Sequence, residues 1–192
     1  MAEMVRNFLS LLRIKHWMKN TFVFLPVFFA GKIGLVFSTH VAFVFLSFCL
    51  AASSIYILND IIDVEEDRNH PLKRFRPIAS GFFSKNTAAI ILAVLVLLFL
   101  ASLTLIEHAS WYVLGYFLLN ILYSFALKKI SIVDVSCISI GFVLRVIAGG
   151  EEAQVFVSNW MIIMVFLLTI SLAFAKRRDD LVIDVQKDAL RK

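Results

Sequence analysis

The chain has 192 residues, of which 60% are apolar and 17% charged, and its mean hydropathy is +0.87. Soluble domains lie closer to half apolar and a quarter charged, so this composition excludes a water-soluble globule, a disordered chain and a nucleic-acid-binding domain. The formal net charge is +5, from nineteen Lys and Arg residues against fourteen Asp and Glu residues. Length predicts one domain, residues 1–192, and composition predicts an all-α protein that lies in a lipid bilayer.

Six apolar stretches approach the roughly 20 residues that a helix needs to cross a bilayer core of about 30 Å. In chain order they cover residues 21–37, 41–62, 87–106, 110–127, 130–148 and 155–175. Pro26, Gly31 and Lys32 interrupt the first stretch, which predicts a bent or short helix there. We therefore expect a polytopic transmembrane helical bundle with six spans, in which Cys49 and Cys137 are buried apolar residues rather than a disulfide.

The positions of the cations predict the orientation, because Lys and Arg accumulate at the cytoplasmic ends of spans. All but two of the nineteen lie before the first span, between the second and third, between the fourth and fifth, or after the sixth. The exceptions are Lys32, in an intervening loop, and Arg145, inside the fifth span. This alternation predicts six spans in the cytoplasmic membrane, with the N-terminus and the polar loop 59–85 in the cytoplasm.

The fifth span also contains Asp134, eleven residues before Arg145. At 1.5 Å per residue the two charges are about 16 Å apart and cannot pair. We expect Asp134 to orient Lys128 or Lys129, and Arg145 to reach outward or to pair with Glu151. For both residues a structural role is favoured over catalysis.

The second span leads directly into an acidic segment. Helical spacing places its four oxygen-bearing side chains on one face: Asn59, Asp60, Asp63 and Asp67. Carboxylates this close repel one another unless a cation lies among them. Hard oxygen ligands at the mouth of a membrane helix suit a Mg²⁺ ion that completes its shell with water and substrate phosphates. An ordinary solvated acidic loop is the alternative, but ionisable side chains against an apolar span are functional candidates.

Three cations, Lys73, Arg74 and Arg76, follow within residues 70–77. Pro71 and Pro77 limit helix continuation, which predicts an ordered loop. Guanidinium and ammonium groups bind phosphate oxygens, so acids that bind metal followed by these bases predict a diphosphate site. The same cations also belong to the pattern that sets orientation, and the two roles are compatible.

These segments resemble the first signature of the UbiA-type intramembrane prenyltransferase superfamily, Asn-Asp-x-x-Asp-x-x-x-Asp followed by Arg-x-Arg-Pro-x-x-x-Gly, here in residues 59–67 and 74–81. Residues 12–20 (Leu-Arg-Ile-Lys-His-Trp-Met-Lys-Asn) resemble an opening segment of the same family. Three further pieces resemble the branch of decaprenyl-phosphate phosphoribosyltransferases: residues 123–128, residues 145–150 and the pair Lys176-Arg177. The resemblance extends from about residue 10 to residue 181.

The resemblance implies a bundle of about nine helices around a lateral cavity, with Mg²⁺-diphosphate held by Asn59, Asp60, Asp63 and Asp67. Prenyl-transferring members carry a second Asp-x-x-x-Asp motif after the sixth span. Asp180 and Asp184 have that spacing, but the bases before them resemble the phosphoribosyl branch. Because the chain stops just after the sixth span, we expect it to be incomplete at the C-terminus relative to the family.

Phosphoribosyl transfer brings together a diphosphate, a sugar phosphate and an acceptor phosphate, and so needs more fixed cations than prenyl transfer to an aromatic ring. The cations at the expected cytoplasmic end therefore favour phosphoribosyl transfer. Together with the resemblance, they imply a Mg²⁺-dependent transferase that moves 5-phosphoribosyl from phosphoribosyl diphosphate to a polyprenyl (decaprenyl-type) phosphate, for cell-envelope polysaccharide precursors. The expected catalytic residues are Asp60, Asp63 and Asp67, and the expected phosphate-binding residues are Lys19, Lys73, Arg74, Arg76, Lys176 and Arg177. One alternative is transfer of a polyprenyl group from its diphosphate to an aromatic acceptor. Another is a non-catalytic membrane subunit or a transporter.

Overall fold

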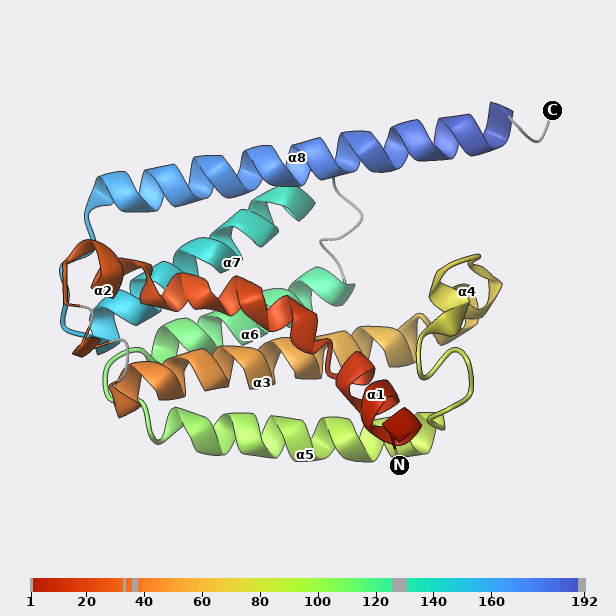
Figure 1. The fold of residues 1–192 in the computed structure, drawn as a ribbon, viewed down its shortest axis with the longest axis horizontal. Helices are drawn as coiled ribbons and strands as arrows, with labels where there is room; N and C mark the ends of the chain where they lie inside the picture. The colour runs from red at the N-terminus through yellow and green to blue at the C-terminus, as the bar shows by residue number, and fades with distance from the viewer. Residues whose placement is uncertain (1, 33, 36–37, 126–130, 190–192) are drawn as a thin grey trace.

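The apolar runs form long helices that pass up and down through a bundle, which Figure 1 shows for the computed structural model. The structure describes residues 2–32, 34–35, 38–125 and 131–189, without the side chains of residues 131 and 179–189. The elements are α1 (Ala2–Leu11), η1 (Ile14–Phe24), α2 (Leu25–Phe29), α3 (Thr39–Ile62), α4 (Val64–Asn69), η3 (Lys73–Phe75), α5 (Lys85–Leu103), α6 (Ser110–Phe125), α7 (Ser131–Glu152) and α8 (Asn159–Ala189). All of these elements are helical, which confirms the predicted class.

Among the residues that the structure describes, four helices are long and apolar enough to cross a membrane: Thr39–Ile62, Lys85–Leu103, Ile132–Glu152 and Asn159–Arg178. They correspond to the second, third, fifth and sixth predicted spans, and the shorter apolar helix α6 corresponds to the fourth. Trp111 and Trp160 are exposed at the starts of α6 and α8, which lie at the same end of the bundle. This position is typical of the aromatic residues that line a membrane interface.

The segment expected to hold the first span is short and bent, as Pro26, Gly31 and Lys32 predicted, and its helical part runs from Ile14 to Phe29. It combines the 3₁₀ helix η1 with α2, and the two extend roughly 30 Å together at about 2.0 and 1.5 Å per residue. This helical part begins before residue 21, where the sequence is more polar, and its polar side chains bind inside the bundle. Trp17 donates a hydrogen bond to Ser53 at 3.1 Å, and the Asn20 amide donates to the Cys49 sulfur at 3.2 Å.

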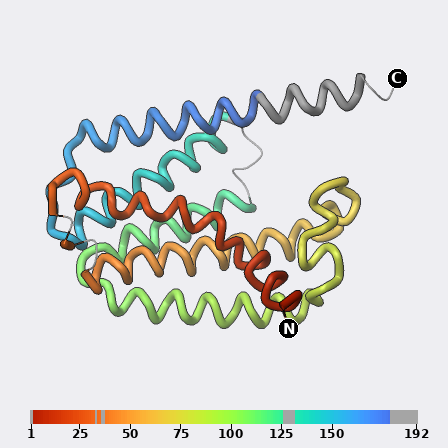
Figure 2. Tube along the Cα trace, viewed as in Figure 1, coloured from red at the N-terminus to blue at the C-terminus, as the bar shows by residue number. Residues whose placement is uncertain are grey.

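The centre of the bundle consists of α3 and α7, and its edges consist of α5 and α8. In their most apolar windows, 61% of α3 and 50% of α7 is buried, against 11% for each edge helix. The trace in Figure 2 shows the alternating directions of these helices and the red η1 segment passing alongside them. The edge helices turn apolar side chains such as Ile90, Leu97, Met164 and Leu167 outward. Such outward faces are suited to lipid and support an integral membrane protein.

The end of the bundle at which α3 passes into α4, on the right in Figure 1, is called the motif end below. A buried apolar cluster fixes the loop there, with Val64 of α4 and Ile78 of the loop packed against Ile57 of α3 and Ala88 of α5. These two anchors order a segment that is otherwise rich in charge. They thereby hold its acids and bases in fixed positions against the helices.

A carboxylate fixes the loop at the opposite end. Glu152, at the end of α7, accepts hydrogen bonds from the backbone N–H groups of Glu107, His108 and Ala109 at 3.1, 2.9 and 3.0 Å. These donors directly precede α6, and the N–H group of buried Ala109 would otherwise lack a partner. Glu152 therefore ties the start of α6 to the end of α7.

Candidate active site

The acidic segment follows a nearly continuous helical path from α3 into α4. Asp63 ends one helix and begins the next, and its backbone N–H still bonds to the Asn59 carbonyl at 2.8 Å. The Asp67 N–H bonds in turn to the Asp63 carbonyl at 2.8 Å. Because Asp60 and Asp67 are two helical turns apart, they lie on the same side of this path. Both side chains are buried.

Asp60 and Asp67 converge on a single nitrogen atom of Arg76. The Arg76 Nη1 donates to Asp67 Oδ2 at 2.6 Å and to Asp60 Oδ1 at 3.1 Å. A second guanidinium, that of Arg13, donates to the same Asp60 oxygen at 2.5 Å. Two carboxylates are therefore paired with two guanidinium groups in one cluster, and one cation position is shared by both acids.

Arg13 was not among the site residues predicted from the sequence. It lies 47 residues before Asp60 and has a left-handed backbone conformation (φ 51°, ψ 47°), which costs a non-glycine residue about 1–2 kcal/mol. Its guanidinium also stacks over the Tyr56 ring at 4.6 Å. The only signal for it is its place in the opening segment 12–20. Its pairing with Asp60 depends on the fold.

The other two predicted metal ligands are Asn59 and Asp63. Asn59 lines a small cavity together with Tyr56, and Asp63 lies half-buried at the junction of the two helices. Within the described part of the chain, no three His, Cys, Asp or Glu side chains gather into a preformed metal site. The donor set fits Mg²⁺, because two carboxylates already share one cation position and Mg²⁺ takes the rest of its shell from water and phosphate.

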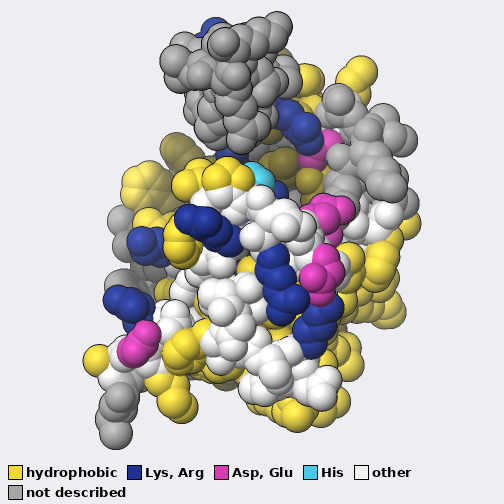
Figure 3. Space-filling model, turned by 90° about the vertical axis from the view of Figure 1, so that its right-hand side faces the viewer, with side chains coloured by type: hydrophobic (Ala, Val, Ile, Leu, Met, Phe, Trp, Pro, Cys, Tyr) yellow, Lys and Arg dark blue, Asp and Glu magenta, His cyan; other side chains and the backbone are white. Residues whose placement is uncertain are grey.

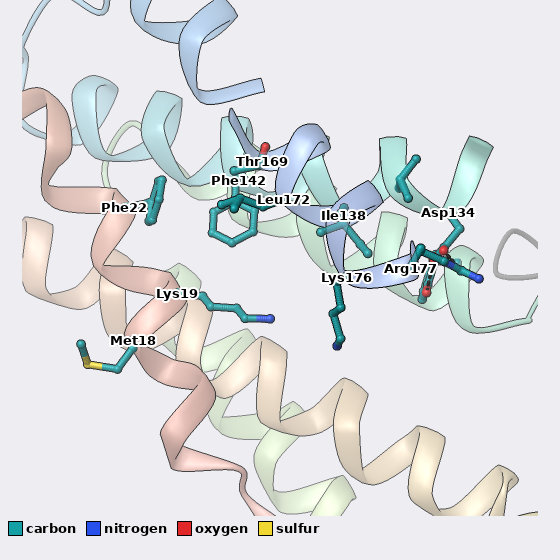
Figure 4. Close-up of a pocket in the computed structure, with 13 residues that line it drawn as sticks. Met18, Lys19, Phe22, Asp134, Ile138, Phe142, Thr169, Leu172, Lys176 and Arg177 are labelled. Carbon is teal, nitrogen blue, oxygen red and sulfur yellow. Dashed lines mark hydrogen bonds and ion pairs between the residues drawn. The ribbon is translucent and has the colours of Figure 1, made fainter. Parts of the chain in front are cut away.

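A cavity of about 550 Å³ lies between η1, α7 and α8. Figure 4 shows Lys19 of η1 and Lys176 of α8 pointing into the same space. Much of the remaining lining is apolar, for example Phe22, Ile138 and Phe142. This combination suits a ligand with a charged head and an apolar chain.

A second cavity, of about 200 Å³, adjoins the first and shares four of its lining residues, namely Lys19, Tyr123, Ile138 and Phe142. It also contains Asn59, which is next to Asp60 in the sequence, and Tyr56, on which Arg13 stacks. The acidic cluster and the basic cavity are therefore connected through neighbouring residues of α3.

Arg177 also lines the large cavity, where it forms an ion pair with buried Asp134 of α7. Asp134 accepts a further hydrogen bond from the Tyr123 hydroxyl at 2.5 Å. Asp134 thus links α6, α7 and α8, as expected for a structural role, and its ion-pair partner is Arg177. Lys128 and Lys129, the partners expected for it, lie outside the described residues.

The prediction that Arg145 reaches outward or pairs with Glu151 was wrong. Arg145 is buried and donates to Asn20 Oδ1 at 2.7 Å, to the Gly141 carbonyl at 2.7 Å and to the Tyr116 hydroxyl at 2.9 Å. It lines the smaller cavity. The sequence concealed this arrangement because Asn20 is 125 residues away.

The remaining predicted bases lie at the surface of the motif end, where Figure 3 shows many Lys and Arg side chains together with acids. Lys73 and Arg74 are exposed on η3.

A surface ion pair lies nearby at the start of α5. Lys85 donates to exposed Glu65 at 3.1 Å, and this hydrogen bond, together with the charge of Arg68, lowers the pKa of the Glu65 carboxyl. Asp180 and Asp184 fall within α8, but their side chains lie outside the description.

Comparison with known proteins gives relatives along most of the chain. The decaprenyl-phosphate phosphoribosyltransferase of Mycolicibacterium smegmatis is 34% identical over 192 residues, which cover 93% of this chain and 58% of the relative. The enzyme of the same name from Corynebacterium glutamicum is 37% identical over 173 residues, which cover 86% of this chain and 52% of the relative. The chain therefore spans little more than half the length of these curated relatives.

The fold also matches solved structures. A UbiA homolog from Archaeoglobus fulgidus bound to GPP and Mg²⁺ has a TM-score of 0.75 at 21% identity, with 93% of this chain and 65% of that chain covered. A family model described as the UbiA prenyltransferase family matches residues 21–191. The chain therefore belongs to the UbiA prenyltransferase family.

Proposed function

We propose that this chain provides the donor site of a Mg²⁺-dependent membrane transferase that moves 5-phosphoribosyl from phosphoribosyl diphosphate to a polyprenyl phosphate of the decaprenyl type. The observation that carries the proposal is the convergence of two buried carboxylates on one cation position, next to a cavity lined by Lys19, Lys176 and Arg177. The names of the two curated relatives support the same reaction. In this proposal the product serves cell-envelope polysaccharide precursors.

The proposed reaction exchanges one oxygen for another at C1 of the sugar. The bond from C1 to the diphosphate oxygen breaks, and its electron pair leaves with the diphosphate. A new bond forms between C1 and an oxygen of the acceptor phosphate. That oxygen is already ionised at neutral pH, so the reaction needs no general base.

In this proposal one set of residues would bind the leaving diphosphate, and another would bind the acceptor phosphate. Asp60 and Asp67, with Asn59 and Asp63, would hold Mg²⁺, which when bound stabilises the charge that develops on the leaving diphosphate. Lys73, Arg74 and Arg76 would bind the diphosphate from the loop side. A second set of bases, Lys19, Lys176 and Arg177, would attract the acceptor phosphate while its apolar chain lies against the rest of the cavity wall.

The proposed orientation follows from the same charges. Lys and Arg gather at the motif end, so this end would face the cytoplasm and the protein would lie in the cytoplasmic membrane. Phosphoribosyl diphosphate is water-soluble and would enter from that side. The lipid acceptor would enter from the bilayer.

The proposal is tested with purified protein in lipid nanodiscs, Mg²⁺, labelled phosphoribosyl diphosphate and a polyprenyl phosphate. We expect a labelled, negatively charged lipid that requires Mg²⁺, and we expect Asp63→Asn and Asp67→Asn to abolish its formation. Arg68→Gln is the matched control, since Arg68 pairs with exposed Glu65 rather than with the buried acids. Absence of both product and donor binding in the wild-type protein would contradict the proposal and favour a non-catalytic subunit.

Prenyl transfer is the second candidate, favoured by the apolar lining of the large cavity and by the prenyl diphosphates in the A. fulgidus homolog structures. The same preparation is therefore incubated with a labelled polyprenyl diphosphate and an aromatic acid. A prenylated aromatic product without a phosphoribosylated lipid would replace the first proposal with the second.

A further inference from the structure

Arg76 holds the two buried acids of the site together. The side chains of Asp60 and Asp67 are each 3% exposed, and both bond to the same Arg76 nitrogen. Two carboxylates so close together and so removed from water are stable only with cations among them. Arg76 therefore occupies a position that a metal ion bound by both acids would also need.

The charges in this cluster already balance. Asp60 and Asp67 carry two negative charges, and Arg13 and Arg76 carry two positive charges within hydrogen-bond distance. A divalent cation that entered alone would leave an excess of positive charge and would have to displace a guanidinium without offering it a new partner. A divalent cation that enters with a diphosphate brings that partner with it, because guanidinium groups bind phosphate oxygens in two-point contacts.

The two arginines differ in their freedom to leave. Arg13 is held on both sides, by Asp60 at 2.5 Å and by the Tyr56 ring at 4.6 Å. Arg76 follows η3 in extended backbone, its side chain is 28% exposed, and its described partners are the two acids alone. Its guanidinium can therefore swing on its flexible stem while buried Pro77 and Ile78 keep the backbone in place. Arg13 would remain on Asp60 throughout.

We propose that Arg76 is an exchangeable counterion: it neutralises Asp60 and Asp67 in the metal-free site and moves to the donor diphosphate when the divalent cation takes its place. This inference rests on the proposed function, since it assumes a donor that carries a diphosphate. Its consequence is thermodynamic coupling, because each of the two ligands binds more tightly when the other is present. The site binds the metal weakly on its own, and Asp60 and Asp67 bind it tightly only when the donor diphosphate is also present.

The test measures two affinities in the full chain, with Mn²⁺ and labelled inorganic diphosphate as the probes. Free Mn²⁺ is quantified by electron paramagnetic resonance without diphosphate, and diphosphate binding is then measured at saturating Mn²⁺. For Arg76→Gln we expect opposite changes: Mn²⁺ alone binds about tenfold more tightly, and diphosphate binds about tenfold more weakly. The control Arg68→Gln should change neither affinity.

Each other role of Arg76 predicts a different pair of results. If Arg76 has a purely structural role, Arg76→Gln weakens both affinities. If Arg76 binds phosphate but never bridges the acids, the substitution weakens only diphosphate binding. If Arg76 is a permanent counterion, diphosphate binding is unchanged. Any of these three outcomes would overturn the inference. Arg76→Lys keeps the positive charge, and it replaces Arg76→Gln in both affinity measurements if the glutamine variant does not fold. It should bind Mn²⁺ alone more tightly than the wild type by a smaller factor and retain most of the diphosphate affinity.

The two proposals fail separately in this design, because the binding measurements need no turnover. Opposite changes in a chain that makes no phosphoribosyl lipid would keep the exchange and reject the phosphoribosyl donor. Normal turnover with unchanged Mn²⁺ affinity in Arg76→Gln would reject the exchange alone.

Discussion

At the scale of single residues, Arg145 shows how a charge can lie inside a membrane-spanning helix. Its guanidinium is surrounded by uncharged acceptors, namely the Asn20 amide, the Gly141 carbonyl and the Tyr116 hydroxyl. The aromatic ring of Tyr116 also lies 4.4 Å from the guanidinium carbon. Among the contacts that the structure describes, no carboxylate neutralises this charge. Arg145 therefore contributes positive potential to the smaller cavity that it lines.

Tyr116→Phe removes one of the three acceptors and leaves a charged donor without a partner. We expect a loss of about 1–2 kcal/mol in the free energy of unfolding. A hydrogen bond to a charged group contributes more to stability than an average hydrogen bond, and its loss is only partly compensated in a membrane protein. The measurement is reversible unfolding in mixed micelles. Tyr112→Phe on the same helix is the control, because its hydroxyl makes no hydrogen bond within the described residues. Equal stability of the two variants would contradict the expectation.

The acids of the candidate site and the base Arg76 stand out in the sequence, but their pairing and the second base, Arg13, do not. Asp60 and Asp67 stand out because charged side chains adjoin an apolar span at helical spacing. Arg13 and Asn20 are residues of unremarkable type whose roles come from contacts with segments far along the chain. Local spacing predicts which side chains share a helix face, but pairing across 47 or 125 residues depends on how the helices pack.

At the scale of elements, η1 and α7 cross more closely than any side chain would allow. A Cβ atom on Gly149 of α7 would collide with the carbonyl oxygen of Val23 in η1. The same two elements are joined by the hydrogen bond between Arg145 and Asn20. The crossing therefore fixes the position of Lys19, which precedes Asn20 and points into the large cavity.

Gly149→Ala should lower stability by about 3 kcal/mol or more, the upper part of the range for overpacking, because backbone atoms cannot move aside as a flexible side chain can. Gly115→Ala on α6 is the matched control. A Cβ there meets open space, and a helical Gly→Ala change raises stability by about 0.5–1 kcal/mol. Thermal unfolding of both variants in the same detergent should show shifts of opposite sign. A neutral Gly149→Ala would show that the crossing is looser than described.

The spans themselves were predictable wherever apolar residues face both lipid and the protein interior, as in α3 and α5. The helical part of the first segment begins at Ile14, before the apolar stretch, and η1 turns Trp17 and Asn20 toward partners on α3 and α7. Hydropathy scores such residues as polar, although their polar atoms are satisfied inside the bundle. A search for continuous apolar sequence therefore selects residues 21–37 and passes over the more polar residues 14–20.

At the scale of the whole molecule, the two ends of the bundle differ in charge. The motif end presents many Lys and Arg side chains. The other end contains Glu107 and His108 in the loop before α6, and Glu151 and Glu152 at the end of α7. In a membrane this asymmetry sets a single orientation. In the orientation proposed above, the phosphate-binding candidates would lie on the side from which a water-soluble donor would arrive.

Cysteine labelling tests this orientation with a matched pair of exposed apolar positions. Leu72 is 71% exposed at the motif end, and Phe156 is 86% exposed between α7 and α8 at the other end. In intact cells a membrane-impermeant maleimide should label Phe156→Cys and spare Leu72→Cys until the membrane is permeabilised. The unsubstituted chain supplies the background, since Cys49 and Cys137 are buried. The reverse pattern would place the motif end outside the cell.

The hydrogen bond between Asn20 and Arg145 has a consequence for synthesis. Chains are made from the N-terminus, and each later span of this bundle packs against one that already exists: α5 and α6 against α3, and α8 against α7. Asn20 departs from this order, because the charged group that binds its oxygen emerges 125 residues later. The segment η1 is thus synthesised before α7 but gains this contact only when α7 has been made, and the cavity wall that carries Lys19 then takes its final position.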